Sequence, residues 1–216
     1  NFIKYTNLHR VNMNEFNGNL IVISGQSGSG KSTLIKRLMS EEKNIYFSIS
    51  STTRPPRENE QHGVNYFFIS EDEFKKSIEN DEFIEWAKVH NFYYGTSINK
   101  IYEALKLGKN VIFDIDVQGH EIVCKKILNL TSIFITTATA TELKNRLLKR
   151  NTDDIATIQR RLDNATGEMK FIKNYDYLII NDDFERAYLQ FKSIYLATKS
   201  RVANINLDFI KNWQKN

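Results

Sequence analysis

The most informative stretch of this chain is Gly25-Gln26-Ser27-Gly28-Ser29-Gly30-Lys31-Ser32. It follows the apolar run 20–23 and precedes the helical pattern 33–38, which predicts a buried strand, a glycine-rich turn and the N-terminus of a helix. Glycines let the backbone curl tightly, with successive N–H groups pointing at a polyphosphate, and the positive end of the helix adds to the attraction. The stretch therefore predicts a loop that binds a nucleoside triphosphate.

The motif gives each position of this loop an expected task. Lys31 would reach the β- and γ-phosphates, and the Ser32 hydroxyl would hold Mg²⁺. The residues expected to contact the triphosphate are Gly25, Ser27, Gly28, Ser29, Gly30, Lys31, Ser32 and Thr33. The alternative is a glycine-rich turn that caps an ordinary helix, but the strand and the helix on the correct sides of the loop favour the phosphate site.

The composition is that of an ordinary globular chain. Of 216 residues, 41% are hydrophobic and 26% are charged, and no apolar run approaches the ~18 residues that a membrane span needs. The single cysteine, Cys124, lies in an amphipathic helical pattern and is expected to be a small core residue rather than a nucleophile. We expect a reducing, cytoplasmic setting and no membrane partner.

The net charge of +4 raises the question of nucleic-acid binding. Basic residues nevertheless lie beside acidic ones along most of the chain, and no long lysine or arginine stripe occurs. Phosphate-handling sites explain the excess of positive charge more economically, so no nucleic-acid partner is expected.

Alternating apolar runs and helical patterns indicate the fold class. Three further apolar runs predict buried parallel strands, at 111–113, 132–135 and 177–180. Helical patterns separate them, at 98–107, 120–130 and 141–149. This alternation predicts an α/β fold, a three-layer core with a central parallel sheet. A last helix, at about 183–200, would present one apolar face to that core, formed by Phe184, Ala187, Tyr188, Phe191 and Tyr195.

Two stretches, 48–97 and 137–170, interrupt the alternation, and residues 1–18 precede it. Residues 1–18 are polar and irregular and form an N-terminal extension, and 48–97 predict a small β-rich insertion. Residues 137–170 carry four arginines and few bulky apolar side chains, so this segment is not expected to pack tightly by itself and is a candidate mobile lid. The core would then comprise 19–47, 98–136 and 171–216, the last including the C-terminal helix.

A second anion site is predicted in the insertion. Arg54 and Arg57 flank Pro55-Pro56, a rigid turn that would let both guanidinium groups converge on one anion. Tyr66 and Tyr94 would add phenolic hydrogen bonds to the same anion. The alternative is a solvated loop with unrelated arginines.

Three carboxylates are candidates for ligand binding. Glu85 lies inside an apolar strand, where it either faces solvent or waits for a ligand that donates hydrogen bonds. Asp114 and Asp116 follow the strand 111–113, at the carboxyl edge where ligands bind in open α/β sheets. Asp114 would assist Mg²⁺ coordination. The alternative for these aspartates is capping of the next helix, for which Asp116 is the stronger candidate.

Together these motifs resemble those of the guanylate kinases. The matching stretches are 50–57, 63–68, 82–86, 93–96, 114–119 and 180–183, and the resemblance covers roughly residues 19–200. It implies a P-loop NTPase core with a GMP-binding insertion at 48–97 and a lid at 137–170. It also implies Mg²⁺-dependent phosphoryl transfer from ATP to GMP, and to dGMP, in a monomer or weak dimer.

The resemblance implies a role for each matching residue. Those that would hold the GMP phosphate are Arg54, Arg57, Tyr66 and Tyr94, and those that would bind the nucleotide around the guanine are Ser50, Glu85, Thr96, Asp114 and Asp116. Arg146, Arg150 and Arg161 would be lid arginines that close on the ATP phosphates, and Asn181 would lie near the adenine. Lys31, Arg54, Arg146 and Arg161 would carry the catalysis, and Ser32 and Asp114 would hold the metal.

The chain departs from the family pattern at four places. Gln26 stands where proline is frequent, and Thr96 replaces a common serine but keeps its hydroxyl. Residues 137–140 replace a proline-containing turn, so the adenine contacts there are not assigned. Arg150 lacks the glycine that usually follows it, which bears on the hinge of the lid.

Base chemistry separately favours guanine. Guanine presents N1–H and N2–H₂ as adjacent donors and O6 as an acceptor, and two carboxylates plus a hydroxyl are the matching partners. Adenine would strand a buried carboxylate. The alternatives are a kinase for adenylate or thymidylate and a catalytically silent interaction module of the same family. Glu85 and Asp116 argue against the first, and the intact Gly30, Lys31 and Ser32 argue against the second. None of the four histidines is assigned a role.

Overall fold

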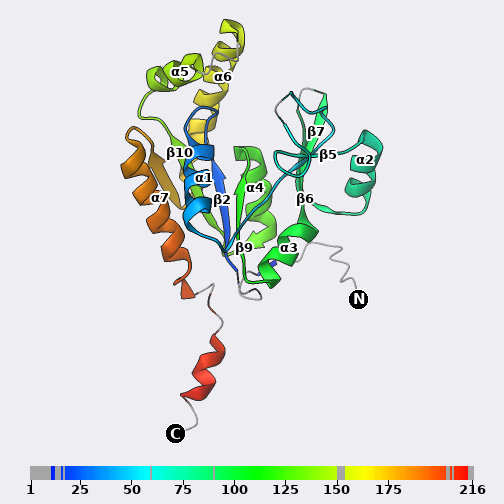
Figure 1. The fold of residues 1–216 in the computed structure, drawn as a ribbon, viewed down its shortest axis with the longest axis vertical. Helices are drawn as coiled ribbons and strands as arrows, with labels where there is room; N and C mark the ends of the chain where they lie inside the picture. Colours follow the sequence, from blue (N-terminus) through cyan, green and yellow to red (C-terminus); the bar gives the residue numbers. More distant parts are fainter. Residues whose placement is uncertain are drawn as a thin grey trace.

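The computed structural model describes residues 11–12, 16, 18–58, 60–89, 91–149, 154–202, 205 and 207–213. Helices cover both faces of a central sheet, with a small β-rich unit on one side and a helical pair projecting beyond the sheet (Figure 1). The predicted lid residue Arg150 and most of the predicted N-terminal extension lie outside the described residues. Within the part of the chain that the structure describes, no helix is long and apolar enough to cross a membrane.

The central sheet is parallel throughout, as predicted. Its five strands run in the order β11-β10-β2-β8-β3. Their bounds are β2 Leu20–Ser24, β3 Ile45–Phe47, β8 Asn110–Asp114, β10 Thr131–Thr136 and β11 Tyr177–Ile180. Because β2 lies in the middle, the phosphate-loop motif that follows it starts at the centre of the carboxyl edge of the sheet.

Two helical layers complete the three-layer core. Ile21 and Ile23 of β2 pack toward α1 (Lys31–Glu41) and α7 (Phe184–Thr198). Leu20 and Val22, on the opposite face, pack toward α3 (Ile98–Lys106) and α4 (Val117–Lys126). The predicted face of α7 is confirmed at its four fully buried members, Ala187, Tyr188, Phe191 and Tyr195, while Phe184 is only partly buried.

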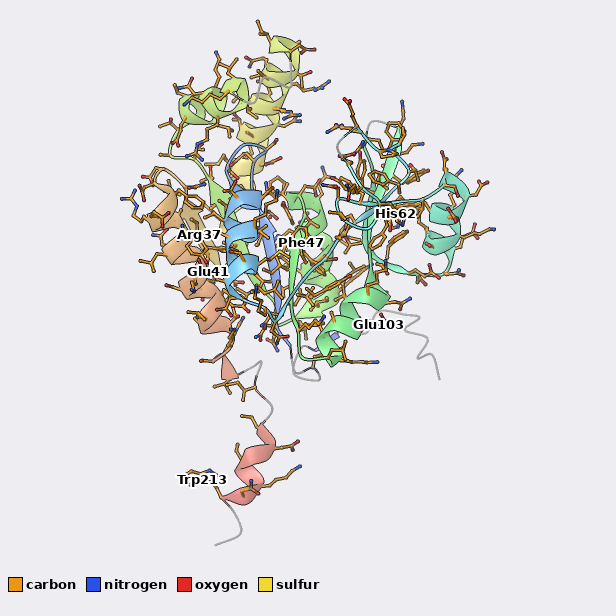
Figure 2. The ribbon with its side chains drawn as sticks, viewed as in Figure 1. Arg37, Glu41, Phe47, His62, Glu103 and Trp213 are labelled. Atoms are coloured by element: carbon orange, nitrogen blue, oxygen red, sulfur yellow. The ribbon has the colours of Figure 1, made fainter. Side chains whose placement is uncertain are left out.

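Ion pairs tie α1 to α7 at the surface, where Figure 2 labels Arg37 and Glu41. Arg37 Nη1 donates to Glu185 Oε1 at 2.6 Å, and Lys192 Nζ donates to Glu41 Oε2 at 2.6 Å. Beyond α7, a short helical turn, η4 (Leu207–Asn212), lies apart from the sheet, and Trp213 beside it is 79% exposed (Figure 2).

The prediction of buried strands is wrong for 177–180. In β11 only Ile179 is buried, while Tyr177, Leu178 and Ile180 are each more than 40% exposed. β11 is the edge strand of the sheet, so part of its apolar surface has no neighbouring element to cover it.

The predicted helix 120–130 is shifted. It begins at Val117, because the side chain of Asp116 accepts a hydrogen bond from the Gly119 N–H and caps it, and it ends at Lys126. The next two residues instead form the short strand β9 (Ile127–Leu128), which pairs in parallel with β1 (Val11–Asn12). The N-terminal extension was expected to be irregular, yet its described part contributes this strand and Phe16, which stacks on Tyr102.

The β-rich insertion is confirmed as a separate mixed sheet. Its strands run in the order β5-β4-β7-β6, with bounds β4 Ser51–Thr52, β5 Phe67–Phe68, β6 Phe83–Val89 and β7 Phe92–Ser97. Helix α2 (Glu71–Glu79) begins with a capping box formed by Ser70 and Glu73. Its buried Phe74 stacks on Phe83, with ring centroids 4.4 Å apart, and joins the helix to this sheet.

The segment 137–170 contains two helices and a small buried cluster. The segment contains α5 (Ala140–Lys149), α6 (Ile155–Glu168) and the start of the short helix η2 (Met169–Asn174). The two α-helices share a buried cluster of Leu143, Leu147, Ile158 and Ala165. These few apolar residues form a cluster because they all lie at the interface between the two helices. Motion of the segment stays a prediction.

Candidate functional site

The phosphate loop has a backbone that requires glycine. Gly25 and Gly30 have φ of 140° and 96°, in the region that disfavours other residues. A Cβ added to Gly25 would lie 1.9 Å from the Ile135 carbonyl oxygen, and one added to Gly30 would lie 2.2 Å from Asn181 Nδ2. The loop is therefore packed against β10 and the residue after β11, which fixes its position at the sheet edge.

Lys31 folds back across this loop. Its Nζ donates to the Gly25 carbonyl at 2.6 Å and to the Gln26 carbonyl at 3.3 Å, and it lies 3.9 Å from Asp114 Oδ1. Burial raises the pKa of the Asp114 carboxyl above its ordinary value, and the Lys31 ammonium opposes that shift. A partly buried carboxyl of this kind favours a bound cation.

A cavity of about 340 Å³ connects the loop to the insertion. Tyr66 of the insertion, Asp114 at the end of β8 and Asp116 beyond it contribute to its wall together with the loop. The lining residues are Gly25, Gln26, Ser27, Gly28, Gly30, Lys31, Ser32, Thr33, Tyr66, Asp114, Ile115 and Asp116. Of the predicted acceptor-site residues, Tyr66, Asp114 and Asp116 line this cavity, while Arg54, Glu85 and Thr96 do not.

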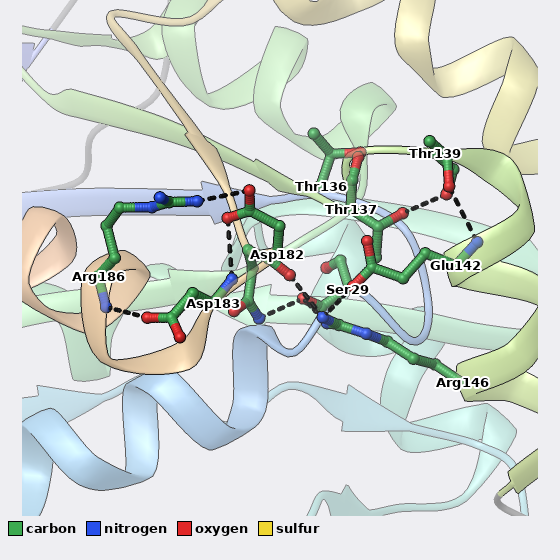
Figure 3. Close-up of polar contacts among 10 residues, drawn as sticks. Ser29, Thr136, Thr137, Thr139, Glu142, Arg146, Asp182, Asp183 and Arg186 are labelled. Carbon is green, nitrogen blue, oxygen red and sulfur yellow. Dashed lines mark hydrogen bonds and ion pairs between the residues drawn. The ribbon is translucent and has the colours of Figure 1, made fainter.

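Arg146 reaches the phosphate loop from α5 (Figure 3). It donates to the Ser29 carbonyl at 3.3 Å and to the Asn181 carbonyl at 2.5 Å, and it pairs with Glu142. Asn181 Nδ2 also donates to the Ser29 carbonyl, at 2.7 Å. From α6, Arg161 Nη1 donates to Ser27 Oγ at 3.3 Å. These three predicted residues therefore converge on the loop.

Arg54 is held in place by a carboxylate that the sequence analysis missed. Its Nη2 donates to both oxygens of Glu60, at 2.9 and 2.8 Å, and the Arg57 N–H donates to Glu60 Oε2 at 2.9 Å. The Arg54 guanidinium lies 5.5 Å from the Tyr66 ring centroid, which is 6.0 Å from that of Tyr94. An acidic residue on the same turn as two arginines was the available signal. Arg57 itself is exposed.

The predicted base-reading groups Ser50, Glu85 and Thr96 lie together. Thr96 Oγ1 donates to Glu85 Oε1 at 2.5 Å, and the Ser50 and Thr96 hydroxyls are 3.3 Å apart. Burial raises the pKa of Glu85, the Thr96 hydrogen bond opposes this, the Asp116 carboxylate raises it further and Lys126 lowers it. One Asp116 oxygen caps α4, so the capping alternative is confirmed, and base reading by Asp116 stays a prediction.

The guanylate kinase family model matches residues 17–198 of this chain. The chain belongs to the guanylate kinase family. A guanylate kinase of Campylobacter jejuni strain RM1221 is 52% identical over 197 residues, which cover 90% of this chain and 96% of the relative. One from Helicobacter pylori strain 26695 is 50% identical over 202 residues, covering 93% and 97%. The crystal structure of guanylate kinase from Anaplasma phagocytophilum aligns with a TM-score of 0.68 at 28% identity, covering 87% of this chain and 89% of that one.

The donor set of this guanylate kinase fits a magnesium ion that also binds phosphate. Among the residues with described positions, no three histidine, cysteine or acidic side chains cluster as a complete metal site. Ser32 and Asp114 line the same cavity, and their hydroxyl and carboxylate groups are oxygen ligands. An ion held there would take its remaining ligands from phosphate and water.

His120 and Cys124 lie outside the cavity lining of this guanylate kinase. The buried His120 ring stacks on Tyr175 with centroids 3.9 Å apart, and the Cys124 sulfur lies 3.2 Å from His120 Nε2. Burial raises the pKa of the Cys124 thiol to about 11, so it is protonated at neutral pH and a poor nucleophile. The finding for Cys124 agrees with the core role expected from the sequence, whereas no role was predicted for His120.

Proposed function

We propose that this chain transfers the terminal phosphoryl group of ATP to GMP, and to dGMP, giving ADP and GDP. The observation that carries the proposal is a cavity whose lining includes the phosphate loop, Tyr66 and Asp116. Membership of the guanylate kinase family supports it. The site is built within one chain, which suits a monomer or a weak dimer, and the substrates suit a cytoplasmic enzyme.

The proposed mechanism is direct in-line transfer without a covalent enzyme intermediate. Loop N–H groups and Lys31 hold the donor phosphates, and Lys31 leaves its Gly25 carbonyl partner to do so. Arg146 and Arg161 add positive charge around the transferred group, which carries diffuse negative charge. Mg²⁺, held by Ser32 and Asp114, would neutralise charge on the donor phosphates when bound.

The acceptor is held by the insertion. Arg54 and Arg57 neutralise the GMP phosphate, so that two polyanions approach each other, and Tyr66 and Tyr94 donate to it. Ser50, Glu85, Thr96 and Asp116 read the guanine. Closing the 48–97 and 137–170 segments over the cavity would exclude water, which would otherwise hydrolyse ATP.

Turnover with ATP and a panel of acceptors tests this function. GMP and dGMP should be phosphorylated far faster than AMP or dTMP, because an adenine ring leaves the Glu85 carboxylate without a donor. Coupled detection of ADP with each acceptor at equal concentration gives the ratio. Equal rates with AMP would reject guanine as the substrate base.

Glu85→Gln should weaken guanine selectivity. An amide replaces one acceptor by a donor that faces the guanine N–H groups, so the GMP preference over AMP should fall by about 1–3 kcal/mol. The measurement is kcat/KM for both nucleotides, with Glu79→Gln on exposed α2 as a matched control. An unchanged preference in Glu85→Gln removes this residue from the reading of the base.

GMP binding should weaken as the pH falls, beginning above the usual range of a glutamate. Burial raises the pKa of Glu85, and protonation converts its acceptor into a donor. The stability of the unliganded protein should instead rise as the pH falls. Because the pKa of Glu85 is higher in the folded than in the unfolded state, ionising this carboxyl destabilises the folded state, and protonation removes that cost. GMP affinity measured against pH should show an acid limb that Glu85→Gln lacks.

A further inference from the structure

The strand that carries Glu85 contains a β-bulge. Along the ladder between β6 and β7, Phe83 pairs with Ser97 and Glu85 pairs with Thr96, with a register shift between them. Two residues of β6 therefore advance against one of β7, and Ile84 has no residue opposite. Bulges of this kind bend a strand and redirect the side chains beside them. Here the redirected side chain is Glu85, which accepts the short hydrogen bond from Thr96.

The bulge is tied to the core helix α4. The Ile84 side chain is fully buried in the core cluster that also contains Val123 of α4. The Ile84 carbonyl accepts a hydrogen bond from Lys126 Nζ at 2.6 Å. Lys126 is the last residue of α4, whose first turn is capped by Asp116. Helix α4 thus connects the two acids that are expected to read guanine. Asp116 caps its start, and Lys126 at its end contacts the residue next to Glu85.

The charge of Lys126 also favours the form of Glu85 that can bind guanine. Its ammonium lowers the pKa of Glu85, against the larger effect of burial, and so favours the ionised carboxylate that guanine N–H groups require. The other groups that act on Glu85 are the Thr96 hydroxyl and the Asp116 carboxylate. Lys126 is the cation among these groups.

We propose that Lys126 is a positioning residue for guanine recognition: it fixes the bulge at Ile84 and thereby holds Glu85 toward the base. This inference rests on the proposed function and deepens it. Lys126 lies in the core helix α4, whereas the carbonyl that it contacts lies in the insertion, and this separation explains why the sequence analysis did not single out Lys126. Lysine and the backbone carbonyl it contacts are 42 positions apart in the chain.

Three variants test the proposal. Lys126→Met keeps the side-chain stem but removes the donor and the charge, and KM for GMP should rise about tenfold while KM for ATP stays unchanged. Lys126→Arg keeps both properties and should restore most of the GMP affinity. Lys125→Met, at the adjacent exposed position, should behave as the unmodified protein.

The preference for GMP over IMP distinguishes a positioning role of Lys126 from a purely structural one. Preference for GMP over IMP, which lacks the N2 amine, should fall in Lys126→Met, and the effect should be absent when Glu85 is already glutamine, because both changes act on one contact. A lowered Tm with an unchanged GMP to IMP ratio would overturn the proposal, as would full additivity with Glu85→Gln. Failure of the unmodified chain to phosphorylate GMP would instead reject the proposed function itself.

Discussion

Replacing Lys31 by methionine should reduce kcat about a thousandfold while GMP still binds. Lys31 is placed between two carbonyls of the phosphate loop and the Asp114 carboxylate, at the point where donor phosphates would enter. Its ammonium would balance charge that develops on the transferred group, and methionine keeps the side-chain length without that charge. The acceptor groups Arg54 and Glu85 lie in the insertion and should be unaffected.

Steady-state turnover with ATP and GMP, together with calorimetric GMP binding, separates these effects. Lys36→Met, on the exposed face of the same helix, is the matched control and should retain normal turnover. Loss of GMP binding in Lys31→Met at an unchanged Tm would mean that the donor and acceptor sites are divided differently from our assignment. Normal turnover would remove Lys31 from the catalytic groups.

The core and the phosphate loop were predictable because their signals are local. The loop motif lies between β2 and α1, and the apolar runs of β8 and β10 are long enough to show buried strands. Hydrophobic runs do not distinguish a central strand from an edge strand, so the exposure of Tyr177 and Ile180 was not foreseen. The short strand β3, with only partly buried residues, was not predicted.

Two of the features that the sequence analysis missed depend on contacts between distant segments. Ile127 continues the helical pattern of α4 in sequence, but pairing with Val11 makes it extended. Lys126 donates a hydrogen bond to the carbonyl of a residue in a β-bulge, and no residue pattern marks either partner. Glu60 is different, because it is close in sequence to Arg54 and follows the same turn. A charge-pairing search within that turn would have found it.

Arg54→Met should raise KM for GMP about a hundredfold, because a charge-assisted contact to the phosphate is lost. The Arg54 side chain is 13% exposed and already oriented by both oxygens of Glu60. Its removal leaves the Glu60 carboxylate without its guanidinium partner in the expected phosphate cradle, where the negative charge would repel the phosphate. Arg54→Lys should be only a partial substitute, since lysine lacks the planar guanidinium fork.

Two comparisons identify the origin of that loss. Guanosine has no phosphate, so its affinity should be the same in Arg54→Met and in the unmodified protein, whereas the GMP affinities should differ. Glu60→Gln added to Arg54→Met should recover part of the GMP affinity, because it removes the uncompensated charge. An equal loss of guanosine affinity would show that Arg54 supports the shape of the insertion, and a failure of Glu60→Gln to recover GMP binding would mean that Glu60 serves only to orient Arg54.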